Sequence, residues 1–108
     1  MAGSSAKDHV HFALSMEHAV RISNREVMAA GMEPLTEDQL LSVSVQVAKA
    51  RAAYMVAAVK VGATDDSAPS ASELRILREE FEEKRDAFAA LMTAIDRGYI
   101  SGPGDNGD

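Results

Sequence analysis

The segment from residue 37 to residue 61 constrains the fold most, because its apolar residues form two separate helical seams. The first seam alternates intervals of three and four residues and comprises Leu40, Val43, Val47, Ala50, Tyr54, Ala57 and Val61. The second seam comprises Leu41, Val45, Ala48, Ala52, Met55 and Val59. At about 100° per residue the two seams lie roughly 150° apart, so this helix needs an apolar neighbour on each of two sides.

Glycine residues divide the chain into three helical segments, which we expect at about residues 7–30, 37–61 and 71–97. Gly31, Gly62 and Gly98 follow these segments directly and are the expected stops. We expect Gly31 in particular to take the left-handed conformation that often ends a helix.

Two capping boxes mark where the second and third helices begin. Thr36 is followed three residues later by Gln39, and Ser70 is followed three residues later by Glu73. In such a box the Ser or Thr side chain and the Glu or Gln side chain each bond a free backbone N–H at the helix start. The spacing therefore predicts helices beginning next to Thr36 and Ser70.

The first and third segments each carry an apolar stripe. In residues 71–97 the stripe has heptad spacing and comprises Leu74, Leu77, Phe81, Lys84, Phe88, Leu91 and Ile95, with a break at Lys84. In residues 7–30 it comprises Phe12, Ala13, Met16, Ala19, Val20, Val27 and Ala30, interrupted by Ser23. Short connections between long helices favour antiparallel neighbours. We therefore predict an all-α domain over residues 7–98, an up-down-up bundle of three long helices, with flexible ends at residues 1–6 and 99–108.

A compact bundle of three helices buries one side of each helix, which leaves the second seam of residues 37–61 without a partner. Soluble monomers seldom expose a contiguous apolar patch of more than a few hundred Å². We therefore predict that Leu41, Val45, Ala48, Ala52, Met55 and Val59 form a homodimer interface, which joins two chains into a larger bundle.

Composition excludes several classes of site. The chain has 108 residues, no cysteine and a net charge of −6. Without cysteine there is no disulfide, thiolate metal site or thiol nucleophile, and we expect a cytoplasmic protein.

The acidic net charge of the chain opposes nucleic-acid binding. Lys49 and Arg51 lie in the middle of the most apolar segment and argue against membrane insertion.

One face of the first helix is the candidate partner-binding face. His11, His18, Arg21 and Arg25 fall on the side of that helix opposite its apolar stripe. An acidic partner helix would complement this face, whereas the alternative is a solvated surface on which Glu17 pairs with Arg21. His11 and His18 are about 10.5 Å apart along the axis, too far to share one metal ion, so we expect no metal or cofactor.

The sequence contains no phosphate-binding glycine loop, nucleophile elbow or catalytic triad spacing, so we do not expect an enzyme. We predict a helical protein–protein interaction module: an adaptor, small chaperone or regulatory subunit that acts as a homodimer. A second interpretation rests on His18 and Arg21, whose placement on an exposed helical face resembles that in histidine phosphotransfer domains. A bundle that binds a small ligand and a transcription-related regulator are two further interpretations.

Overall fold

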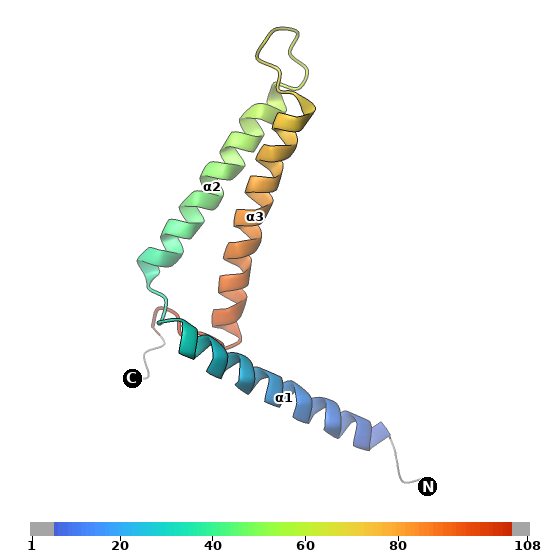
Figure 1. Ribbon diagram of the computed structural model, residues 1–108, viewed down its shortest axis with the longest axis vertical. Coiled ribbons are helices and arrows are strands. Elements are labelled where there is room, and N and C mark those ends of the chain that lie inside the picture. The colour runs from blue at the N-terminus through green and yellow to red at the C-terminus, as the bar shows by residue number, and fades with distance from the viewer. Residues whose placement is uncertain (1–5, 105–108) are drawn as a thin grey trace. The chain divides into compact units, whose positions relative to one another are not determined.

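The computed structural model describes residues 6–104 and contains three helices and no strand in that range (Figure 1). Helix α1 spans Ala6–Gly31, α2 spans Glu37–Val59 and α3 spans Ala71–Asp96. The predicted all-α class is confirmed, and the helix ends differ from the expected ones by no more than two residues, an ordinary variation for helix termini. Residues 1–5 and 105–108, which belong to the predicted flexible ends, lie outside the described residues.

The chain divides into two compact units, which are described separately. One unit is Thr36–Thr93, which contains α2 and most of α3. The other contains α1 and the segment that begins at Ala94.

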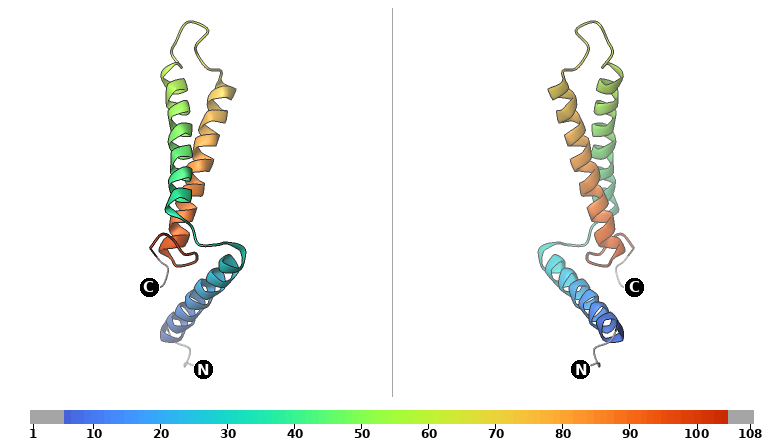
Figure 2. Two further views of the ribbon diagram at one scale, coloured as in Figure 1. Left: turned by 90° about the vertical axis from the view of Figure 1, so that its left-hand side faces the viewer. Right: turned by 90° about the vertical axis from the view of Figure 1, so that its right-hand side faces the viewer.

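In the unit formed by α2 and α3, the two helices run antiparallel and side by side, and a loop joins them (Figures 1 and 2). Val47 and Ala50 of the first α2 seam are buried. The Tyr54 ring stacks on Phe81 of α3, with 6.3 Å between ring centroids. The guanidinium of Arg51 lies 5.1 Å from the centre of the same Phe81 ring. The first α2 seam and the α3 stripe are thus the two surfaces that pack together.

Both predicted capping boxes are present. The Gln39 N–H donates to Thr36 Oγ1 at 3.1 Å, and the Thr36 N–H donates to Gln39 Oε1 at 2.9 Å. At the start of α3 the Glu73 N–H donates to Ser70 Oγ and the Ser70 N–H donates to Glu73 Oε1, both at 3.0 Å. Each box satisfies backbone donors that have no partner within the helix, which fixes where α2 and α3 begin.

The end of α3 is a Schellman motif built on Gly98. Gly98 has a φ of 73°, its N–H donates to the Ile95 carbonyl at 3.0 Å, and the Tyr99 N–H donates to the Ala94 carbonyl at 2.8 Å. A left-handed residue at this position turns the chain so that both N–H groups reach the last carbonyls of the helix.

The expected left-handed stop at Gly31 is wrong. Gly31 is the last residue of α1, and among the described residues only Gly98 and Gly104 have a positive φ. A different device ends α2, where Lys60 keeps a right-handed conformation and its N–H donates to the Ala57 and Ala58 carbonyls. Tightened hydrogen bonds of this kind satisfy the last carbonyls of a helix without a left-handed residue.

In the other unit the segment after α3 lies against the end of α1. Ile100 is only 6% exposed and Ala94 is also buried. The Leu35 N–H donates to the Ser101 carbonyl at 2.9 Å. Gly102 is buried as well, and a Cβ on it would approach Ile95 Cγ2 to 2.8 Å. Residues 99–102 therefore form part of this unit. From the sequence we had predicted them to belong to a flexible end at residues 99–108.

Candidate functional site

The second seam of α2 is exposed along its whole length. We call Leu41, Val45, Ala48, Ala52, Met55 and Val59 the α2 outer stripe, and all six are exposed. Leu41 is 59% exposed and Val59 is 82% exposed. Because the first seam of α2 packs on α3, the outer stripe lies on the other side of the helix, as the sequence indicated. Within the unit formed by α2 and α3, nothing covers this apolar stripe.

Basic residues border the α2 outer stripe. Lys49 and Lys60 lie along one edge at helical spacing, and Arg51 lies along the other. The only acidic residues of α2 are Glu37 and Asp38 in its first turn. The outer stripe therefore has positively charged borders over its second half, from residue 49 onward, whereas the turn that precedes Leu41 is acidic.

Helix α1 has a comparable apolar surface. We call Phe12, Met16, Val20 and Val27 the α1 stripe, and all four are exposed, Phe12 by 67% and Val27 by 71%. No residue of α1 is buried.

The predicted partner-binding face on α1 is exposed, and its four residues border three separate hollows. His11 and His18 border one hollow together with Leu14 and Ser15. Arg21 borders a second hollow, and Arg25 borders a third. The four predicted residues thus share one side of α1 without converging on a single site.

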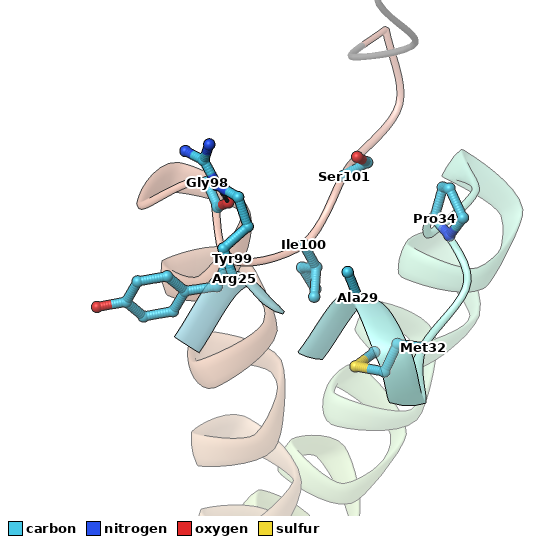
Figure 3. A pocket seen from close by; sticks show the side chains of 8 residues that line it. All are labelled: Arg25, Ala29, Met32, Pro34, Gly98, Tyr99, Ile100 and Ser101. Carbon is cyan, nitrogen blue, oxygen red and sulfur yellow. Dashed lines mark hydrogen bonds between the residues drawn. The ribbon is translucent and has the colours of Figure 1, made fainter. Parts of the chain in front are cut away.

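Arg25 binds the chain segment that follows α3. Its Nε donates to the Gly98 carbonyl at 3.0 Å, as the dashed line in Figure 3 marks. Beside this bond lies a hollow of about 410 Å³, lined by Arg25, Ala29, Met32, Pro34, Gly98, Tyr99, Ile100 and Ser101 (Figure 3). Arg25 therefore has a structural contact within the chain, in addition to its place on the predicted face.

Tyr99 directs its ring away from Met32 and Pro34 (Figure 3) and borders a second hollow of about 590 Å³ together with Arg21 and Arg97. A hydrogen bond from the Arg97 side chain lowers the pKa of the Tyr99 hydroxyl below its ordinary value of 10.0. The side chain of Asn24 and the nearby positive charge of Arg21 act in the same direction. The rest of the lining is Ala13, Leu14, Met16, Glu17 and Val20, so the phenol lies beside two cations, one carboxylate and an apolar wall.

Sequence reasoning missed Arg97, Tyr99 and Ile100 as neighbours of α1. The sequence feature that could have predicted this contact is the pair Tyr99 and Ile100, an aromatic and an aliphatic residue directly after the helix stop at Gly98. An apolar residue at that position often folds back onto the helix end. The contact with Arg25 spans 73 positions in the sequence, and no local pattern encodes it.

Within residues 6–104, no three His, Cys, Asp or Glu side chains are grouped so that they could hold a metal ion. In the same range, none of the helices combines the length and the apolar content needed to cross a membrane. Comparison with protein-family models, curated proteins and solved structures found no match to the chain.

Proposed function

We propose that this protein is a non-catalytic helical interaction module that acts as a homodimer. The observation that carries the proposal is the exposure of the α2 outer stripe, from Leu41 at one end to Val59 at the other. Apolar surface in water costs about 25 cal/mol for each Å², so a row of such side chains favours association.

The proposed dimer would also supply the packing partners that the predicted bundle needs. One chain contributes the packed pair α2 and α3, together with α1, none of whose residues is buried. A helix without buried residues draws little stability from packing, and isolated helices are marginal in water. Two chains supply enough apolar helical surface to complete a larger bundle in which every helix has a neighbour.

The side of α1 opposite its stripe would then face a further protein partner. His11, His18 and Arg21 are exposed there, and Arg97 adds positive charge beside Arg21. A cationic surface of this kind complements an acidic helix or loop, and charge complementarity mainly speeds and orients association. An adaptor, a small chaperone or a regulatory subunit would use such a surface.

The mass of the protein in solution tests the proposal. We expect analytical ultracentrifugation of the unaltered chain to show two chains per particle. Ala48→Glu combined with Ala52→Glu places two carboxylates in the outer stripe, and we expect one chain per particle with helical content retained.

Ala89→Glu combined with Ala90→Glu is the matched control. It adds the same charge to exposed positions of α3, away from the stripe and its borders, and we expect the mass of two chains. A mass of one chain for the unaltered protein at all concentrations would contradict the proposal.

A further inference from the structure

Each of the two stripes is exposed within its own unit of the chain, and the helices that carry them have similar lengths. Helix α1 has 26 residues and α2 has 23. At a rise of 1.5 Å per residue, the α1 stripe from Phe12 to Val27 extends about 23 Å and the α2 outer stripe from Leu41 to Val59 about 27 Å, so one stripe can lie along most of the other.

The edges of the α1 stripe are acidic, and the borders of the α2 outer stripe are basic from residue 49 onward, although Glu37 and Asp38 lie in the first turn of α2. Glu17 lies along one edge of the α1 stripe and Glu26 along the other. The α2 outer stripe has Lys49 and Lys60 along one edge and Arg51 along the other. Glu17, Glu26 and Lys49 are all exposed. Opposite charges at the rim of an apolar contact favour that pairing over the pairing of like surfaces.

The basic residues of α1 lie on the side of the helix opposite the α1 stripe. Arg25 lies opposite the α1 stripe on the helix and is bonded to the Gly98 carbonyl. The segment after α3 borders the α1 stripe only at Met16 and Val20, which share a hollow with Tyr99 and Arg97, and all four residues of the stripe stay exposed.

From these observations we infer that the α1 stripe of one copy packs on the α2 outer stripe of a second copy, and reciprocally. The inference rests on the proposed homodimer and names the surfaces that form it. Two identical contacts related by a twofold axis close the assembly and cover all four stripes. If α2 packed on α2 of the second copy instead, both α1 stripes would stay exposed, and like charges along the α2 edges would face each other.

Disulfide trapping distinguishes these arrangements, because the chain has no cysteine of its own. Met16 and Ala48 lie near the middle of α1 and α2, are exposed, and belong to the two stripes. If α1 and α2 are aligned at their midpoints, these two positions are about 4 Å apart along the helix axis whether the helices run parallel or antiparallel. The experiment mixes a tagged Met16→Cys chain with an untagged Ala48→Cys chain, oxidises the mixture and separates the products by mass.

We expect the mixed disulfide to exceed both disulfides between identical chains. If the main product is instead a disulfide between two Ala48→Cys chains, α2 faces α2. That result overturns this inference and leaves the proposed homodimer intact. If the double variant in one chain forms an internal disulfide while the particle has the mass of one chain, both the inference and the proposed dimer fall.

Charge reversal provides a second test that leaves the apolar stripes unaltered. We expect Lys49→Glu combined with Lys60→Glu to raise the dimer dissociation constant at least about tenfold at low salt. Adding Glu17→Lys and Glu26→Lys to the same chain should restore most of the affinity, because the edges are then complementary again. Arg75→Glu combined with Arg78→Glu on α3 changes net charge equally and should have little effect. Failure of the Glu17 and Glu26 reversals to restore dimerisation would show that these edges do not meet.

Discussion

Gly98 is the residue whose backbone geometry decides how the chain leaves α3. It holds a φ of 73°, and a Cβ added to it would lie 3.1 Å from Nη2 of Arg25. A side chain at this position therefore costs energy through backbone strain and by displacing the guanidinium that bonds the Gly98 carbonyl. We expect Gly98→Ala to lower the free energy of unfolding by about 1–2 kcal/mol, measured by urea denaturation followed by circular dichroism.

Gly62 provides the matched control for Gly98. It has no positive φ, and a Cβ on it would meet nothing within 4 Å. We expect Gly62→Ala to change the unfolding free energy by less than about 0.5 kcal/mol in either direction. Equal effects of the two substitutions would show that the left-handed turn after α3 contributes little to stability.

At the scale of a helix, the two capping boxes differ in one chemical respect, because Glu73 titrates and Gln39 does not. Hydrogen bonds from Ser70, first from its backbone N–H and then from its side chain, lower the pKa of Glu73 below its ordinary value of 4.5. A carboxylate with a lowered pKa in the folded state stabilises the fold above its unfolded pKa, and this contribution disappears as the pH falls through the folded pKa. The capping box of α3 should therefore weaken in acid, whereas the box formed by Thr36 and Gln39 contains no titrating group and should not.

We expect Glu73→Gln to reduce the loss of stability between about pH 5 and pH 3, because glutamine keeps the capping geometry without a titrating group. Gln39→Glu should have the reverse effect and add an acid-sensitive cap to α2. The measurement is the urea midpoint of each variant at both pH values. Asp65, whose pKa the side-chain and backbone hydrogen bonds of Ser67 lower, remains in every variant and sets a common background slope. The same change in urea midpoint between the two pH values for the unaltered protein and both variants would contradict the role given to Glu73 in the acid sensitivity of α3.

The helices and their packed seams could be predicted from the sequence, because local patterns determine them. The capping boxes at Thr36 and Ser70 gave the starts of α2 and α3, and the spacing of three and four residues identified the seam that contains Val47. The contact between Arg25 and Gly98 joins residues far apart in the chain and could not be read from any such pattern. The site was predictable only as a surplus of apolar surface on α2, since a helical wheel shows which residues share a face and not what covers that face.

At the scale of the whole molecule, the helices of a single chain differ in what holds them. Val47 and Ala50 of α2 are buried against α3, whereas no residue of α1 is buried. Helix formation is cooperative but weak in water without tertiary contacts, so α1 depends on whatever covers its stripe. The protection of its amides against hydrogen exchange should then report on association.

We expect the amides of α1 around Met16 to lose protection when the protein is diluted below the dissociation constant of the dimer, while those around Val47 keep most of theirs. The reason is mass action: in the proposed dimer a second copy covers α1 and dilution removes it, whereas the pairing of α2 with α3 within one chain does not depend on concentration. Hydrogen exchange followed by mass spectrometry at two concentrations measures both regions in one experiment. The Ala48→Glu and Ala52→Glu double variant should show the diluted pattern at every concentration. Protection of α1 that is independent of concentration in the unaltered chain would mean that its stripe is covered from within the same molecule.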